Sequence, residues 1–326
     1  MKMFPSLNLE RVFITGGAGF IGSHLVDKLC EMGLKVVVFD NLSSGTIENV
    51  KEWLNAPNFK FIHGDLLSPK EIVRSIEGCD IIFHFAANPE VRVGSEDPKI
   101  HYEQNVLATF NLLEAIRKVG RVKILVFTSS STVYGDAELI PTPEDYAPLK
   151  PISTYGASKL AAEALISAYA NTCGFKAIIY RLANIVGLRS QHGVIYDFIK
   201  KLRENPNRLE ILGDGTQTKS YLYVEDCIDA ILTGLNAGNE RVNIFNVGSE
   251  DQIIVKEIAD IVCTKMGLRD VQYVFTGGVD GGRGWKGDVK VMLLKIDRLK
   301  SLGWKPKLNS RQAVERAVSE ILNAAR

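Results

Sequence analysis

Tyr155 and Lys159 stand four residues apart, in a stretch that predicts a helix over residues 154–172. Residues four apart lie on one face of a helix, so the phenol and the ammonium are expected side by side. A phenol with the ordinary pKa of about 10 is a poor base at neutral pH, but a neighbouring positive charge favours the phenolate. The pair is therefore a candidate general base for taking a proton from a hydroxyl group.

A hydroxyl-rich segment precedes this pair, where Ser129 and Ser130 follow the predicted strand 122–128. Ligands of α/β sheets bind beyond the carboxyl ends of the strands. A serine at that position would hold a developing carbonyl oxygen or relay a proton. A tyrosine and a lysine at this spacing are frequent on helices by accident, so the serine-rich strand end is what makes the combination informative.

A glycine-rich turn near the N-terminus is the second chemical signal. Gly16, Gly19 and Gly22 follow the predicted strand 11–15 and open a predicted helix. Glycines at this spacing permit a tight turn and let the backbone approach a pyrophosphate, and the helix N-terminus offers N–H groups to the anion. Asp40 ends the next predicted strand, about 20 residues on, as the dinucleotide-binding pattern requires.

Asp40 also selects the cofactor. A carboxylate there accepts hydrogen bonds from a ribose 2′-hydroxyl and repels a 2′-phosphate, which predicts NAD rather than NADP. Asp65 ends the third predicted strand and is expected to reach the adenine, although a purely turn-forming aspartate stays open as the alternative. Phe85, Ala86 and Ala87 end the fourth, where small residues would let the backbone pass close to the cofactor.

Short apolar runs alternate with helical stretches as far as residue 181. This alternation predicts the α/β class, with a Rossmann-type doubly wound parallel sheet. The 326 residues suffice for two domains at about 100–200 residues each. We expect an NAD-binding domain over residues 1–181, which also receives about 218–247, and a smaller C-terminal α/β region over 182–326 that binds substrate. The predicted strands are 11–15, 35–40, 59–63, 80–85, 122–128 and 177–181, and the predicted helices about 19–32, 69–77, 98–119 and 154–172.

The composition disfavours several classes of protein. The net charge is +1, without the excess of basic residues that is typical of proteins that bind nucleic acid or a membrane surface. The five cysteines form no C-x-x-C pair, which argues against disulfides or a zinc site and favours a reducing compartment. No run approaches the ~20 apolar residues of a membrane span, and residues 1–10 lack the apolar core of a signal peptide. We expect a cytoplasmic protein without a bound metal.

Together these motifs resemble those of the extended short-chain dehydrogenases/reductases, and within them the UDP-galactose 4-epimerase group. The resemblance covers nearly the whole chain and implies Ser130, Tyr155 and Lys159 as catalytic residues. The similar segments are T-G-G-A-G-F-I-G-S-H-L (15–25), D-N-L-S-S-G (40–45), H-G-D (63–65), F-A-A-N-P-E-V-R (85–92), S-S-S-T-V-Y-G (129–135), Y-G-A-S-K (155–159), G-D-G-T-Q (213–217) and L-G-W-K-P (302–306). The implied cofactor contacts are Gly16, Gly19, Phe20, Ile21, Asp40, Asn41, Ser43, Gly45, Asp65, Leu66, Phe85, Ala86, Ala87, Asn105, Tyr155 and Lys159.

The resemblance also implies which residues bind a UDP-sugar, beginning with Ser130. Asn184 matches an R-x-x-N pattern that contacts the diphosphate, and Lys219 stands where many relatives carry arginine. Lysine keeps the charge but loses the bidentate fork. Arg283 and Asp288 resemble an R-x-G-D motif with two extra residues, which leaves open whether Arg283 or Lys286 meets phosphate.

The function implied by the resemblance is that of an isomerase, an NAD-dependent UDP-glucose 4-epimerase. Tyr155 would take the proton of the sugar 4-hydroxyl while hydride passes to NAD⁺, and hydride would return to the opposite face of the 4-keto intermediate. Related 4,6-dehydratases resemble T-D-E-V-Y-G where this chain has Ser131 and Thr132. The chain therefore lacks the two carboxylates that elimination of water needs.

Three alternatives stay open. One is another enzyme on this scaffold, such as an epimerase of uronic or N-acetylated sugars, a decarboxylase or a dehydrogenase. The others are a non-catalytic NAD sensor, which the catalytic residues disfavour, and a purely structural module, which a dinucleotide site disfavours.

The resemblance also implies a homodimer through the helices near 98–119 and 154–172, with Ala161, Ala162 and Leu165 on the exposed faces. His192 is interpreted as a solvated loop residue, and Trp53, Trp285 and Trp304 as packing residues.

Overall fold

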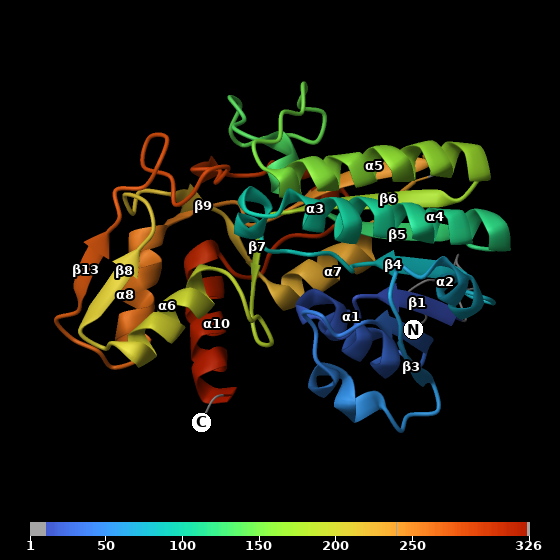
Figure 1. Cartoon of the computed structure of the whole chain (residues 1–326), viewed down its shortest axis with the longest axis horizontal. Coiled ribbons are helices and arrows are strands. Elements are labelled where there is room, and N and C mark those ends of the chain that lie inside the picture. Colours follow the sequence, from blue (N-terminus) through green and yellow to red (C-terminus); the bar gives the residue numbers. More distant parts are fainter. Residues whose placement is uncertain (1–10, 239, 325–326) are drawn as a thin grey trace.

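The computed structural model describes residues 11–238 and 240–324, and at its centre lies a sheet of seven parallel strands (Figure 1). The strand order is β11–β6–β5–β4–β1–β2–β3, which confirms the predicted Rossmann-type sheet. Residues 1–10, where we find no signal-peptide pattern, lie outside the described part. The strands are β1 (Arg11–Thr15), β2 (Lys35–Asp40), β3 (Phe59–His63), β4 (Ile81–His84), β5 (Ile124–Ser130), β6 (Lys176–Leu182) and β11 (Val242–Val247).

Helices cover both faces of this sheet, which explains why its strands are apolar throughout. Successive side chains of a strand point to opposite faces. In β1, Val12 and Ile14 join one buried cluster, and Phe13 joins the other. Figure 1 shows α4 and α5 on one face and α1 and α7 on the opposite face. The helices are α1 (Phe20–Glu31), α2 (Pro69–Ser75), α4 (Ala108–Val119), α5 (Thr154–Cys173) and α7 (Val224–Gly234).

The segment predicted as a helix over 98–119 is helical throughout, but it is not a single α-helix. The chain instead forms α3 (Pro98–His101), a π-helical segment at Tyr102–Leu107, and then α4. A π-helical turn adds a residue to one turn of the helix and so shifts the register of the face that follows, and such turns are frequent at functional sites. Here it places Asn105 inward, 2% exposed.

The outer face formed by α4, α5 and the π-helical segment carries exposed aromatic side chains. Tyr102 is 59% exposed and Phe110 is 40% exposed. Ala162, which we expected on this face, is instead fully buried against the sheet, because it lies on the inner stripe of α5. Ala161 and Leu165 are partly exposed.

After β6 the chain builds a second set of small sheets beside the first and returns once to the central sheet, as β11.

Among the residues described, no helix has the length and apolar character to cross a membrane, and no three His, Cys, Asp or Glu side chains gather as metal ligands. The remaining elements are β7 (Asn184–Val186), β8 (Arg208–Ile211), β9 (Thr218–Lys219), β10 (Tyr221–Tyr223), β12 (Ile253–Ile254), β13 (Gln272–Phe275), β14 (Val291–Met292), α6 (Val194–Glu204), α8 (Val255–Lys265), α9 (Asp297–Ser301) and α10 (Ser310–Ala324), with 3-10 turns η1 (Ile47–Trp53), η2 (Arg92–Ser95) and η4 (Ser131–Tyr134).

A buried histidine at the end of β4 makes the stability of the fold depend on pH. His84 is 1% exposed, and its Nδ1 and Nε2 each lie 2.8 Å from a threonine hydroxyl, of Thr15 and Thr109 respectively. Burial, and secondarily the charge of Lys159, lowers the pKa of His84 to about 3. An unfolded histidine titrates near pH ~6.5. Below that pH the unfolded chain binds the proton first, so stability present above pH ~6.5 is lost as the pH falls towards 3.

We expect the free energy of unfolding, measured in urea, to fall by up to about 1.4 kcal/mol per pH unit below pH ~6.5 through this group. His84→Asn should be less stable at neutral pH and show a shallower decline. His63→Asn, at an exposed position on β3, is the matched control and should keep the wild-type slope. Equal slopes in wild type and His84→Asn would contradict the assignment.

Candidate active site

A cavity of about 670 Å³ lies along the carboxyl ends of the strands and continues into the C-terminal half. Ligands of open α/β sheets bind at this edge. Every predicted cofactor and substrate residue lies on its wall except Asn105 and Arg283. The predicted residues that line it are Gly16, Gly19, Phe20, Ile21, Asp40, Asn41, Ser43, Gly45, Asp65, Leu66, Phe85, Ala86, Ala87, Ser130, Tyr155, Lys159, Asn184, Lys219 and Asp288.

The glycine turn is built for close approach. Gly16 has a φ of +70°, and a Cβ there would lie 2.6 Å from the backbone nitrogen of Ala86. A Cβ at Gly22 would collide with the carbonyl of Gly16. No side chain in the described part of the chain caps the N-terminus of α1. Phe20 and Ile21, the first two residues of this helix, line the cavity. A diphosphate fits this helix N-terminus, where free N–H groups and the helix dipole favour an anion.

Asp40 anchors the same turn from β2. Its Oδ2 accepts from Ala18 N at 2.9 Å and its Oδ1 from Leu42 N at 2.8 Å. A carboxylate has about four acceptor positions, so it retains capacity for ribose hydroxyls. Burial raises the pKa of Asp40, and these two N–H groups act in the opposite direction.

We expect Asp40→Ala to weaken NAD binding about tenfold or more, since a hydrogen bond to a charged group is worth ~1.5–3 kcal/mol. Discrimination against NADP should relax, because a 2′-phosphate would no longer meet a carboxylate. Asp40→Asn keeps an acceptor for Ala18 and isolates the charge. Asp65→Ala is the control for discrimination only, because a residue near the adenine should affect NAD and NADP alike. Calorimetric titration with both cofactors measures the ratio, and tighter binding of NADP than NAD by the wild type would refute the role of Asp40.

Asp65 is both turn-former and wall residue. Its Oδ1 accepts from Leu67 N at 2.7 Å, as the alternative interpretation required. Its Oδ2 accepts from Asn41 Nδ2 at 3.0 Å, and both side chains border the cavity.

Asn105 is placed differently from our expectation. It lies behind the wall, where its Nδ2 donates to Ser158 Oγ at 2.9 Å and its Oδ1 accepts from Asn88 N at 2.8 Å. Its amide is therefore occupied by the protein, and it connects the π-helical turn to α5 rather than facing the cavity.

Ser130, Tyr155 and Lys159 come together from β5 and α5. Ser130 Oγ accepts from Thr132 N at 3.2 Å and from Thr132 Oγ1 at 2.9 Å. Lys159 is 4% exposed, its Nζ donates to Thr128 O at 2.9 Å, and this nitrogen lies 5.9 Å from the centre of the Tyr155 ring. Ser153 caps α5 by accepting from Gly156 N at 3.0 Å, which sets where the helix begins.

The electrostatics of this pair differ from our expectation of a phenolate favoured by its neighbour. Burial raises the pKa of Tyr155 to about 12, and a hydrogen bond with Ser130 acts in the opposite direction. Burial lowers the pKa of Lys159 to about 7, which the negative charge of Glu163 opposes. Desolvation is thus the largest influence on the pKa of each group, and the ammonium is directed to a backbone carbonyl.

His101 supports Tyr155 and was not predicted from the sequence. Its ring packs edge-on against the phenol, with ring centres 5.6 Å apart. Its Nδ1 lies 3.0 Å from Thr154 Oγ1, and its Nε2 lies 3.1 Å from the carbonyl of Glu90. These contacts connect the start of α5 to the loop after β4.

Two of the three cations considered for the diphosphate, Arg283 and Lys219, are paired with carboxylates. Arg283 forms a bidentate pair with Asp136, at 2.9 Å for each contact, and does not line the cavity. Lys286 is exposed and does not line it either. Lys219 lines the cavity, with its Nζ 2.6 Å from Asp288 Oδ1. Of the three candidates, Lys219 is therefore the one placed to meet an anionic ligand.

Trp285 belongs to the cavity wall, and not simply to the packing core as we had interpreted it. Arg92 Cζ and Lys219 Nζ each lie 5.7 Å from the centre of its ring. Its Nε1 and the Oε1 of Gln217, which also borders the cavity, are buried without a hydrogen-bond partner in residues 11–238 and 240–324. In the sequence, the two extra residues between Arg283 and Asp288 were the feature that indicated a difference from the family in this part of the cavity wall.

Comparisons with known proteins agree with this geometry. A model of the NAD dependent epimerase/dehydratase family matches residues 12–248. A solved UDP-galactose 4-epimerase is 45% identical, with a TM-score of 0.85 over 97% of this chain and 100% of that one. The UDP-glucose 4-epimerase of Thermus thermophilus, solved with NAD, is 32% identical, with a TM-score of 0.84 over 96% of this chain and 99% of that one. UDP-glucuronic acid decarboxylase 1 of Arabidopsis thaliana is 31% identical over 96% of this chain and 70% of its own.

The matched family and the site coincide on the chain, because the dinucleotide turn, the serine-rich strand end and the Tyr–Lys helix all fall within residues 12–248. The glycine turn and Asp40 fit the cofactor that the family uses. The chain is an NAD-dependent enzyme that belongs to the epimerase/dehydratase family, in the UDP-galactose 4-epimerase group of the extended short-chain dehydrogenases/reductases.

Proposed function

We propose that this enzyme is a nucleotide-sugar 4-epimerase that interconverts UDP-galactose and UDP-glucose through a 4-keto intermediate. The observation that carries the proposal is the meeting of Ser130, Tyr155 and Lys159 on one wall of a cavity that also contains the dinucleotide turn. The similarity to solved 4-epimerases supports it.

The roles of the three residues follow from their chemistry. Tyr155 takes the proton from the sugar 4-hydroxyl, and Ser130 donates a hydrogen bond to the oxygen as it becomes a carbonyl. Lys159 in its charged form favours the phenolate. NAD, when bound, supplies the hydride-accepting and hydride-returning chemistry, and tight retention of NAD would suit a cycle that regenerates it.

The substrate half of the cavity offers groups suited to a UDP-sugar. Lys219 provides the positive charge for the diphosphate, and Asn184 lies on the same wall with its Nδ2 donating to Ser220 O at 3.2 Å. Trp285 Nε1 and Gln217 Oε1 belong to residues of the cavity wall, and within the described part of the chain both atoms are buried without a hydrogen-bond partner.

Elimination is disfavoured by the residues beside Ser130. Ser131 and Thr132 stand where the dehydratase pattern has an Asp-Glu pair, and Thr132 is engaged in donating to Ser130 Oγ at 2.9 Å. A second candidate, an enzyme acting on a UDP-uronic acid, is favoured by Arg92, which lines the cavity and whose Nε pairs with Glu90 Oε1 at 3.1 Å. Its guanidinium could receive a sugar carboxylate.

We also propose a homodimer that covers the outer face of α4 and α5, where Tyr102 and Phe110 are exposed. Sedimentation of the purified protein would test it, with Tyr102→Glu as the variant expected to weaken association.

The experiment that tests the proposed function uses the purified enzyme without added cofactor. The protein is first denatured and its released NAD measured, and the native enzyme is then given UDP-galactose, UDP-N-acetylglucosamine or UDP-glucuronic acid separately. We expect conversion of UDP-galactose to UDP-glucose with no net NADH. Release of carbon dioxide from UDP-glucuronic acid, or turnover that demands stoichiometric NAD⁺, would overturn the proposal.

A further inference from the structure

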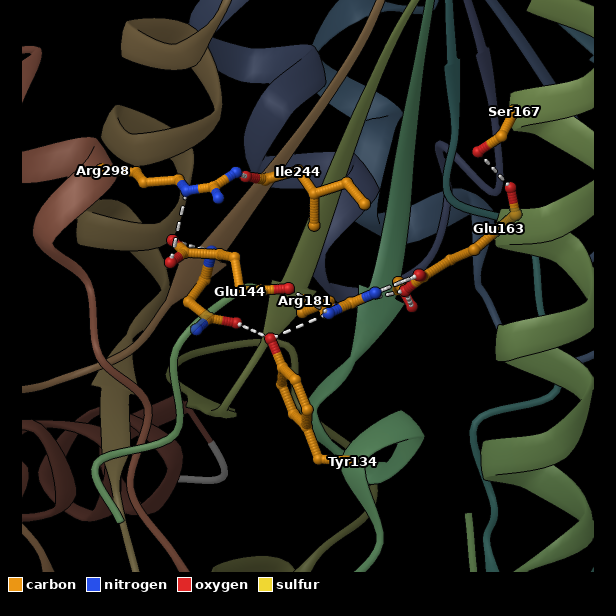
Figure 2. A network of polar contacts seen from close by, with 9 residues as sticks. Tyr134, Glu144, Glu163, Ser167, Arg181, Ile244 and Arg298 are labelled. Carbon is orange, nitrogen blue, oxygen red and sulfur yellow. Dashed lines mark hydrogen bonds and ion pairs between the residues drawn. The ribbon is translucent and has the colours of Figure 1, made fainter. Parts of the chain in front are cut away.

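Figure 2 shows a buried ion pair between Glu163 and Arg181. Glu163 of α5 and Arg181 of β6 have side chains 5% and 4% exposed, and Arg181 Nη2 lies 2.7 Å from Glu163 Oε2. Arg181 Nε donates to Glu163 Oε1 at 3.0 Å, so the contact is bidentate. In the sheet, Arg181 is the register partner of Ser129 on the neighbouring strand β5.

This pair connects the strand end that carries Ser130 to the helix that carries Tyr155 and Lys159. Ser129 Oγ donates to Glu163 Oε1 at 2.5 Å. Glu163 is one helical turn beyond Lys159, whose Nζ donates to Thr128 O at 2.9 Å. Two successive residues of β5 are therefore bound to two successive turns of α5, immediately before Ser130.

Arg181 also binds the segment that follows Ser130, through its second terminal nitrogen. Arg181 Nη1 donates to Tyr134 Oη and to the carbonyl of Glu144, each at 3.0 Å. Tyr134 Oη in turn donates to Asn246 Oδ1 at 2.7 Å. Figure 2 shows Arg181 between Glu163 on one side and Tyr134 on the other. Ser130 thus lies between two points that are both bound to this ion pair.

Stability alone is a weak reason for such a pair. Desolvation of two buried charges offsets most of their attraction, and well-packed apolar residues of similar volume are often as stable or more so. What the pair supplies here is a fixed separation between β5 and α5, because both charges have several directed partners. Catalytic groups lose efficiency when they are displaced by as little as about 1 Å.

We propose that Glu163 and Arg181 are positioning residues that set Ser130 against Tyr155 and Lys159. The proposal rests on the proposed function for its kinetic consequence, while its structural consequence stands independently.

Ser129→Ala is the sharpest variant, because it removes the hydroxyl between Glu163 and the strand end and leaves the ion pair intact. We expect kcat to fall about tenfold or more, with KM and bound NAD within about twofold of the wild type. Tyr180→Phe is the matched control, since Tyr180 lies next to Arg181 and its buried hydroxyl donates to Ile231 O at 2.7 Å, away from the site. It should lose comparable thermal stability and keep kcat.

A second pair of variants gives the rescue test. Glu163→Ala should lose more kcat than Ser129→Ala, and Glu163→Gln, which keeps an acceptor for Ser129, should recover part of that loss. Glu163→Leu combined with Arg181→Met should lose kcat while keeping more thermal stability than Glu163→Ala, because no charge is left unpaired.

Crystal structures of wild type and Ser129→Ala provide a readout that needs no turnover. We expect the distance between Ser130 Oγ and Tyr155 Oη to change in the variant and not in Tyr180→Phe. An unchanged distance, or a kcat of Ser129→Ala equal to that of Tyr180→Phe, would overturn the positioning role. If the wild type turns over none of the UDP-sugars, the proposed function fails, and the crystallographic comparison still decides this inference.

Discussion

Tyr155→Phe is expected to lower turnover by roughly 10²–10⁴-fold or more, because it removes the group that takes the proton from the sugar. The ring itself remains, so its contact with His101 and the capped start of α5 should persist. Thermal stability and NAD content should therefore stay close to the wild type.

The control for this variant is Tyr146→Phe. Tyr146 also loses a hydroxyl contact, with Glu138 N at 3.2 Å, but it does not line the cavity. Initial rates with UDP-galactose, normalised to bound NAD, make the comparison. Activity of Tyr155→Phe within a few-fold of Tyr146→Phe would remove Tyr155 from the mechanism.

The second large effect should come from Ser130→Ala, with a loss of roughly 10²–10³-fold in kcat, the range found when one donor to a developing oxyanion is removed. Ser130 lines the cavity and its Oγ is oriented by two contacts from Thr132, at 3.2 and 2.9 Å. Thr132 occupies only acceptor positions of Ser130, so the hydroxyl proton serves the hydrogen bond with Tyr155 and, in the proposed mechanism, is directed at the substrate oxygen when a sugar is bound.

Ser131→Ala provides the neighbouring control, because Ser131 also borders the cavity and is a hydroxyl of the same size. A larger loss in Ser131→Ala than in Ser130→Ala would move the catalytic role by one residue. The comparison is informative because adjacent residues at the end of a strand point in different directions.

The features that the sequence could predict are those whose chemistry is local. The central strands follow from continuous apolar runs, and the glycine turn, Asp40 and the Tyr–Lys pair each lie within one element or at its end. Each of these features could be predicted from the order of residues in one short segment. In the structure the glycine turn, Asp40 and the Tyr–Lys pair line the same cavity.

The features that were missed depend on partners far along the chain. Arg283 was one of the candidates for the phosphate contact, but its partner Asp136 lies 147 residues away in sequence. Asn105 was expected at the cofactor, but a π-helical turn directs it to Ser158 and Asn88. Ala162 was expected outside, because a nearly uniform apolar helix such as α5 does not reveal which stripe faces the sheet.

The pKa values of the catalytic pair show the same limitation. The sequence predicted that Lys159 and the positive ring of the cofactor would together favour the phenolate of Tyr155, whereas in the protein alone burial raises the pKa of Tyr155 to about 12 and lowers that of Lys159 to about 7. Burial is a property of the assembled site and opposes both charges. In the proposed mechanism, the positive charge of a bound nicotinamide would favour the phenolate from the cavity side.

The measurement that tests the central claim most directly follows hydrogen at C4 of the sugar. The enzyme, without added cofactor, is incubated with UDP-galactose in deuterated water and the UDP-glucose formed is examined by NMR and mass spectrometry. We predict UDP-glucose without deuterium at C4, since the hydride removed from that carbon is returned to it without exchange with solvent. Deuterium at C4, a 4-keto-6-deoxy product, or a stoichiometric demand for NAD⁺ would contradict reversible oxidation at a single carbon.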